Sequence, residues 1–384
     1  MGKIDHIEAI SNELAAANTV SSIPRRCNHV RNHNSKCKRC IYACKHDAIT
    51  RRVGNIEISA ELCTGCGACI AACPATAFSA QNVDQNELVL RAKEIGKRCG
   101  GVVCFVCEKN AIEANMDTSN VIVLPCLDYL DEYLLCGLFA CGISHVALFQ
   151  PGCDGCIIDS DDPYINKTID SAKTLLKEWK VKGKLKVFHE IPENMCNKKS
   201  RHNSVEADSR RSAFAQAGAS VLGYVTDSID NMLATDEEKR KKEKKSKSIV
   251  VKIEDVDSAK TYRSVRMIAL LRYIGTLPKD STIYSRFWCD IHIDEAKCKY
   301  CGACATFCPT RALRYKQKDP SDIYSPATLI FRPELCTACN LCKDSCMHKA
   351  LLTSNRVPAN NLEPKFYVTL FKNKKPENKN PFGF

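Results

Sequence analysis

The chain has 384 residues, enough for two or three domains, and 26 of them are cysteine. It has no apolar run of about 18 residues and no basic-then-apolar leader, so we expect neither a membrane span nor a secreted disulfide framework but a soluble cytoplasmic protein. The formal charge of +12 is typical of nucleic-acid or acidic-membrane partners, but four [4Fe-4S] clusters at about −2 each would lower it to about +4, so no such partner is required.

Residues 1–22 predict a short amphipathic N-terminal helix, and residues 23–86 carry two cysteine runs. The bacterial ferredoxin pattern is C-x2-C-x2-C-x3-C. The second run fulfils it with Cys63, Cys66, Cys69 and Cys73. The first run has only the last three positions, Cys37, Cys40 and Cys44, because Asn34 stands at the first. Between the runs, alternating apolar residues around a Gly54-Asn55 turn predict a β-hairpin.

The pattern of apolar and polar residues changes over residues 87–196. After a helix over 87–98, the strand-length runs GGVVCFVC, VIVLPC, HVALFQPGC and KLKVFHEI alternate with the helix-like stretches LDEYLLCGLFACGI and YINKTIDSAKTLLKEWK. Buried strands that alternate with helices are typical of a parallel sheet. We therefore expect a central α/β domain here.

Residues 197–285 predict a charged linker with helices, including the run KRKKEKKSK. Residues 286–356 predict a second module with two complete runs, Cys298, Cys301, Cys304 and Cys308, then Cys336, Cys339, Cys342 and Cys346. Residues 357–384 predict a flexible tail. The expected fold class is α+β, with two ferredoxin-like dicluster modules flanking a central α/β parallel-sheet domain.

Each pair of runs resembles the bacterial two-cluster ferredoxin, in which the fourth cysteine of each run binds the cluster of the other run. For the second module this resemblance implies one cluster on Cys298, Cys301, Cys304 and Cys346, and another on Cys336, Cys339, Cys342 and Cys308. For the first module it implies one cluster on Cys63, Cys66, Cys69 and Cys44. The remaining cluster then has Cys37, Cys40 and Cys73 and lacks one thiolate.

One nearby cysteine is left to supply the missing ligand of that cluster. Cys27 lies ten residues before Cys37, and we expect residues 28–36 to form a looped detour that returns it to the place of Asn34. The alternatives are a three-thiolate centre, such as [3Fe-4S], with Cys27 free, or ligation by His29 or His33.

Five further cysteines, Cys104, Cys107, Cys126, Cys153 and Cys156, follow or end three expected parallel strands, and the carboxyl edge of such a sheet is where ligand sites form. This stretch resembles the iron-sulfur delta subunit of methyl-viologen-reducing hydrogenase, although its closing cysteine pair is more closely spaced than in that family. The resemblance implies a binuclear cluster and electron transfer to a heterodisulfide reductase. A [2Fe-2S] centre, a structural zinc site, a redox-active dithiol and buried thiols stay open.

No dinucleotide fingerprint, phosphate loop or nucleophile with a recognisable base occurs in the chain. Iron-sulfur clusters carry single electrons, so the sequence predicts an electron-transfer subunit of an anaerobic redox complex. The partner would be a hydrogenase, a heterodisulfide-reductase-like enzyme or a flavoprotein. The alternatives are a reductase with its own active site in the central domain and, less favoured, a nucleic-acid-binding protein.

Overall fold

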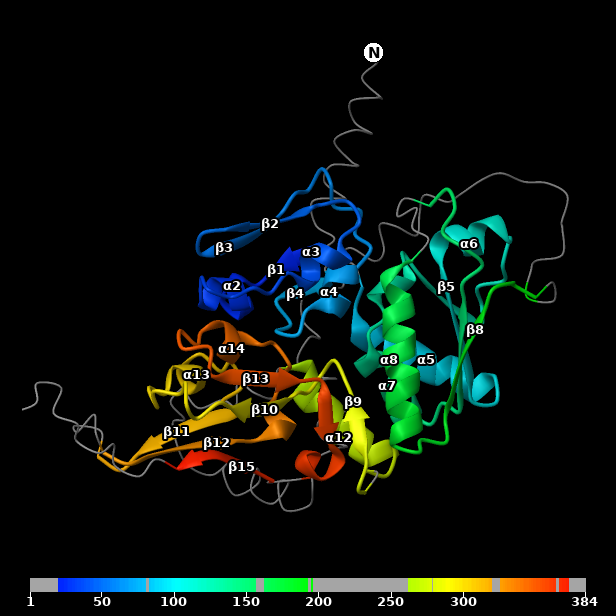
Figure 1. Ribbon diagram of the computed structural model, residues 1–384. Helices are drawn as coiled ribbons and strands as arrows, with labels where there is room; N and C mark the ends of the chain where they lie inside the picture. The colour runs from blue at the N-terminus through cyan, green and yellow to red at the C-terminus, as the bar shows by residue number, and fades with distance from the viewer. Residues whose placement is uncertain are drawn as a thin grey trace, which may run out of the picture.

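A computed structural model describes residues 20–80, 83–156, 162–192, 195, 262–277, 279–319, 325–363 and 366–372. Two small modules and a parallel sheet domain make up this part of the chain (Figure 1). Helices and strands are mixed, as expected. Within the described residues, no helix is both long and apolar enough to cross a membrane.

The first module, over residues 20–80, has two antiparallel strand pairs. β1 (Val20–Ser22) pairs with β4 (Phe78–Ala80), so the two ends of the module meet. β2 (Ile49–Arg52) and β3 (Asn55–Ile58) form the expected hairpin, with Gly54 at φ 70° in its turn. The helical turns are η1 (Pro24–Arg26), α2 (Asn28–Arg31), α3 (Arg39–Ala43) and α4 (Ala68–Ala72).

The second module, which begins near residue 286, repeats this plan. β10 (Asp290–Ile293) pairs antiparallel with β13 (Leu351–Ser354), as β1 does with β4. The hairpin of β11 (Leu313–Gln317) and β12 (Ala327–Phe331) corresponds to β2 and β3. The helical turns are α13 (Ala303–Thr306), η6 (Pro333–Leu335) and α14 (Leu341–Asp344).

The sheet domain contains four parallel strands in the order β6-β5-β7-β8, which confirms the prediction of a parallel sheet. These strands are β5 (Val102–Cys107), β6 (Val121–Leu124), β7 (His145–Phe149) and β8 (Lys184–Phe188). α5 (Gln85–Arg98), α7 (Glu132–Ala140) and α8 (Tyr164–Glu178) pack with Val103 and Phe105 on one face. α6 (Glu108–Glu113) packs with Val106 on the other, and η2 (Leu127–Tyr129) follows Cys126.

The segment after residue 261 joins the core of the sheet domain. α12 (Arg263–Ile274) packs against α7 and buries Met267, Leu270 and Leu271 completely. Trp179 and Trp288 lie beside them, also fully buried, with ring centroids 5.9 Å apart. A strand pair and a turn complete this region, namely β9 (Thr282–Tyr284), β14 (Arg356–Pro358) and η7 (Ala359–Leu362).

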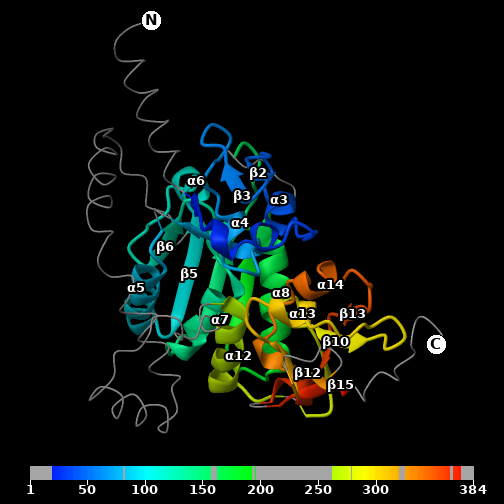
Figure 2. The ribbon, with the colours of Figure 1, turned by 90° about the vertical axis from the view of Figure 1, so that its left-hand side faces the viewer.

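The two modules flank the sheet domain in the sequence, but in space they also contact each other. In both ribbon views the first module lies directly against α13 and α14 of the second (Figures 1 and 2). The Lys36 backbone N–H donates to Asp344 Oδ2 at 2.8 Å, and the Arg39 guanidinium donates to the Ala338 carbonyl at 2.8 Å. All the cysteine runs therefore belong to one continuous body.

Three of the expected segments differ in the structure. Residues 1–19 of the expected N-terminal helix lie outside the described residues, and residues 20–22 form strand β1 instead, because they pair with β4. The expected tail is also wrong for residues 357–363 and 366–372. β15 (Val368–Lys372) adds a third strand to β12, since its β-branched and aromatic residues suit a sheet, and Phe371 is buried against Tyr300.

The charged linker expected over 197–285 is described only from residue 262 onward. Its described part is not a linker, because α12 and β9 pack into the domain core. The rest of the linker, with its basic run, and residues 373–384 of the tail lie outside the described residues.

Candidate metal centres

Group A gathers four cysteines of the first module around Cys40. Burial raises the pKa of the Cys40 thiol to about 12, and the nearby thiols of Cys73, Cys37 and Cys27 raise it further. The chain returns Cys27 to this group through α2 and a turn in which the Asn34 backbone N–H donates to Asn32 Oδ1 at 2.9 Å. Asn34 itself is exposed.

The histidines of this segment lie differently. His29 Nε2 is 3.2 Å from the Arg52 carbonyl oxygen in the hairpin, and the side chain of His33 is exposed. Of the alternatives for the missing ligand, the thiol of Cys27 is therefore the one that neighbours Cys40.

Group B lies next to group A. Burial raises the pKa of the Cys69 thiol, and the neighbouring thiols of Cys66, Cys63, Cys40 and Cys44 raise it further. The presence of Cys40 among these neighbours means that the two groups are adjacent. Cys44, the last cysteine of the first run, thus lies with the first three cysteines of the second run.

Two enclosed cavities in the second module are lined by the cysteines of its runs. Group C lines one with Cys298, Cys301, Cys304 and Cys346. Group D lines the other with Cys308, Cys336, Cys339 and Cys342. Cys289 lines the same cavity as a fifth cysteine, and its Sγ is 3.4 Å from Cys336 Sγ. Sequence reasoning assigned Cys289 no role, because it lies outside every run and only the pairing of β10 with β13 brings it there.

Backbone conformation separates the first run from the other three. In those three, a left-handed residue stands on each side of the second cysteine: Gly65 and Gly67, Tyr300 and Gly302, Ala338 and Asn340. In the first run Lys38 follows the second position, as Gly67 follows Cys66, and it has φ −132°. All four runs share a left-handed residue three positions after the last cysteine: Asp47, Thr76, Arg311 and Lys349. The first run therefore differs only in its opening half, where Asn34 replaces cysteine.

Backbone N–H groups point at several of these sulfurs. Ala77 donates to Cys73 Sγ at 3.3 Å, Leu313 to Cys308 Sγ at 3.5 Å, and Ala350 to Cys346 Sγ at 3.4 Å, all from the segment after a run. Such bonds favour the thiolate form that binds metal and tune the potential of a cluster.

The donor set and its burial fit iron-sulfur clusters. Burial and like charge raise the pKa of Cys66 and Cys73 to about 11, and of Cys304 and Cys339 to about 12, so several adjacent thiolates require metal cations to offset their charge. Among the described residues, no three Cys, His, Asp or Glu side chains could hold a single metal ion. A cube binds one cysteine at each of its four irons, so the four cysteines of each group match its number of ligands.

Four of the five central cysteines come together at the carboxyl edge of the sheet, in a set we call group E. Burial is the main cause that raises the pKa of the Cys107, Cys153 and Cys126 thiols. Neighbouring thiols raise these pKa values further: Cys156 acts on Cys107, Cys156 and Cys107 act on Cys153, and Cys107, after Asp128, acts on Cys126. Cys66 of group B also raises the pKa of Cys126. Group E therefore adjoins group B.

Cys104 does not join group E. It packs against Val106 and Phe149 on one face of the sheet, whereas Cys107 packs against the core on the other face. The reason is the strand period: side chains three positions apart in a strand point to opposite faces. The C-x2-C spacing that brings two thiols together in a loop separates them in β5.

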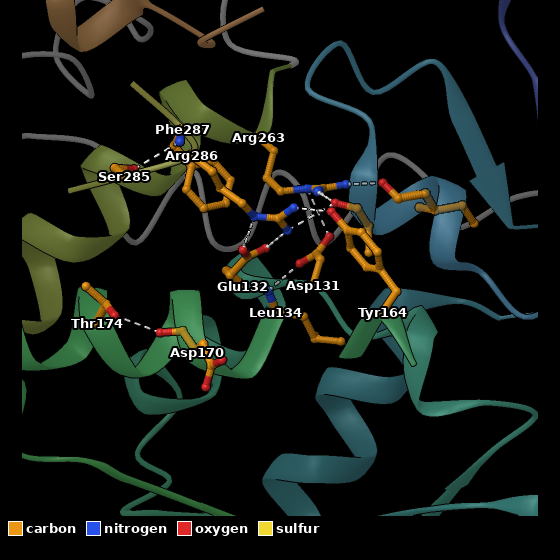
Figure 3. A network of polar contacts seen from close by, with 12 residues as sticks. Asp131, Glu132, Leu134, Tyr164, Asp170, Thr174, Arg263, Ser285, Arg286 and Phe287 are labelled. Carbon is orange, nitrogen blue, oxygen red and sulfur yellow. Dashed lines mark hydrogen bonds and ion pairs between the residues drawn. The ribbon is translucent and has the colours of Figure 1, made fainter. Parts of the chain in front are cut away.

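A buried ionic network fastens group B to the sheet domain (Figure 3). Arg263 donates to the Ala71 and Ile70 carbonyls at 2.7 and 2.6 Å and pairs with Asp131 at 3.0 Å. Arg286 binds both carboxylate oxygens of Glu132 and the Tyr164 hydroxyl. These cations also lie favourably at the C-terminal end of α4.

Comparison with known proteins bears on the two cysteine-rich modules. The 4Fe-4S binding domain family matches residues 56–79 and 291–314, once in each module. No curated protein and no solved structure matches the chain. The resemblance of the sheet domain to the hydrogenase delta subunit stays a prediction. The chain contains two 4Fe-4S binding domains, and they support an iron-sulfur electron-transfer role.

Proposed function

We propose that this chain is an electron relay that holds four [4Fe-4S] clusters in groups A to D and works as a subunit of a larger cytoplasmic redox complex in an anaerobe. The supporting observation is the grouping of its cysteines into four sets, each of which combines both runs of its module. When bound, each cluster accepts or donates one electron. The partner is a hydrogenase, a heterodisulfide-reductase-like enzyme or a flavoprotein.

The protein's own residues do three things for these clusters. The cysteines hold the irons, backbone N–H groups such as those of Ala77 and Leu313 donate to ligand sulfurs, and the apolar cores of the modules exclude water. The adjacency of groups A, B and E supports a continuous path from the first module into the sheet domain. In this proposal group E holds a fifth centre, which is a [2Fe-2S] cluster.

Anaerobic analysis of iron, acid-labile sulfide and zinc, with EPR of the reduced protein, tests the proposal. About sixteen irons for the four cubes and two more for group E are expected. Cys126→Ser should remove only the last two, because Cys126 belongs to group E alone, whereas Cys136→Ala, at a buried cysteine of α7, should remove none. Sixteen irons and one zinc would make group E structural, and fewer than about twelve irons would contradict the relay.

A reductase is the second candidate, because Cys153 and Cys156 are only half-buried and two residues lie between them. Burial raises the pKa of the Cys153 thiol to about 11, and the nearby Lys109 ammonium opposes that rise. Such a dithiol would suit thiol-disulfide exchange. Reduction of a disulfide by the isolated chain with only an artificial electron donor would favour the reductase. Activity that requires a protein partner would favour the relay.

Cys289→Ala is expected to lower the reduction potential of the group D cluster by tens of millivolts, since hydrogen bonds to cluster sulfurs raise the potential. Cys289 is 2% exposed, and its Sγ lies 3.4 Å from Cys336 Sγ. The hydrogen bond between the two sulfurs holds the pKa of Cys336 below its ordinary value. An EPR-monitored redox titration measures the shift, with Cys136→Ala as the control. Loss of the whole cluster in Cys289→Ala would instead make Cys289 a ligand.

A further inference from the structure

A wide basic cleft of about 1060 Å³ lies where the two dicluster modules meet. Three of its cationic side chains, Arg25, Arg26 and Arg31, come from the first module. Three others, Arg311, Arg314 and Lys316, come from the second. Neither module forms the cleft alone, so it exists only because the two modules contact each other.

The charge of this cleft is of one sign. No aspartate or glutamate lines it, and among the described residues none of its six cations forms an ion pair with a carboxylate. Arg26 is half-buried and donates to the Thr76 carbonyl, while the other five side chains are exposed. Six neighbouring cations that pair with no carboxylate of the described residues form a field that attracts anions from solution.

The wall of the cleft reaches a cysteine of group D. Cys308 lines both the cleft and the cavity of group D, and Pro309 and Leu313 do the same. A redox centre seated in the cleft would therefore lie one side chain away from the cluster that we assign to group D.

We propose that the basic cleft is the docking site of a small acidic redox protein, which exchanges one electron with the group D cluster. The inference rests on the proposed relay function. One electron passes from the reduced partner to the cluster, and no bond forms or breaks. Exposed cations spread over two modules match an array of carboxylates better than one or two phosphates, and electron-transfer encounters use small, polar, charge-steered interfaces.

Stopped-flow reduction by a reduced acidic [2Fe-2S] ferredoxin, used as the probe, tests this docking site. The triple variant Arg31→Glu, Arg311→Glu, Arg314→Glu should lower the second-order rate constant about 100-fold at low salt. The rate for the unmodified protein should fall steeply as salt is added, and that of the variant should not. The matched control is Lys173→Glu, Lys177→Glu, Lys182→Glu, which changes the charge equally at exposed lysines of the sheet domain and should leave the rate within about threefold.

Iron content and EPR of every variant distinguish a failure of the relay function from a failure of the docking site. If the unmodified protein lacks cubes, the relay itself fails. If the cubes are present and the cleft variant reacts as fast as the unmodified protein, or no slower than the lysine control, the docking site is overturned. Tight binding of inorganic pyrophosphate that blocks reduction only in the unmodified protein would also overturn it, by making the cleft a phosphate site.

Discussion

Cys27→Ser is expected to convert or remove one cube and leave the other three intact. Cys27 neighbours Cys40 although ten residues separate it from Cys37, and the first run lacks the left-handed residues that surround the second cysteine elsewhere. A serine oxygen is a harder donor than a thiolate and binds iron less well. We expect the protein to lose about one to four irons and group A to give a [3Fe-4S] EPR signal or none.

The controls for Cys27→Ser examine the alternative ligands. His29→Ala and His33→Ala should keep every iron, since the His29 ring meets the Arg52 carbonyl and His33 is exposed. Cys99→Ser, at a half-buried cysteine outside all the groups, should also keep every iron. Unchanged iron and EPR in Cys27→Ser would show that the first run holds its cluster without Cys27.

Glu132→Met is expected to lower the free energy of unfolding by about 3–5 kcal/mol, because it leaves the Arg286 guanidinium unpaired in the interior. Glu132 is 0% exposed and Arg286 25% exposed, and the pair is held by two hydrogen bonds. Loss of the carboxylate also removes the ionic link between α7 and the segment that follows β9. The urea midpoint for loss of cluster absorbance, measured anaerobically, reports the change.

Two comparisons make the Glu132 result specific. Glu113→Met removes an exposed pair with Lys109 and should cost less than about 1 kcal/mol. Arg286→Met in the Glu132→Met background should recover part of the loss, since an apolar pair no longer leaves a buried charge. A midpoint in Glu132→Met equal to that of Glu113→Met would contradict a structural role for the buried pair.

Local patterns in the sequence predicted the parts of the fold that local physics determines. The Gly54-Asn55 turn predicted the hairpin, and apolar runs between helices predicted the parallel sheet. β15 was missed, because its partner β12 lies about forty residues away and a lone apolar stretch after a charged segment has no periodic context. The same limit applies to Cys289, which reaches group D only through strand pairing.

Spacing alone was also insufficient for the sites in two instances. C-x2-C predicted Cys104 and Cys107 as one unit, but spacing does not reveal whether the pair lies in a loop or in a strand, where the period of two separates the thiols. The basic cleft was not predicted either, because Arg25 and Arg311 are nearly 300 residues apart and only tertiary packing joins their charges. The basic run that the sequence did suggest lies outside the described residues.

The burial of α12 against α7 and the ion pairs of Arg263 and Arg286 join two parts of the chain by noncovalent contacts. The described residues of 20–192 and of 262–372 share one apolar core and two ionic pairs, Arg263 with Asp131 and Arg286 with Glu132. These two parts of the chain contact each other as the subunits of an obligate heterodimer do. Two half-chains produced separately in one cell, divided between these segments, would assemble with each other, and neither would be soluble alone.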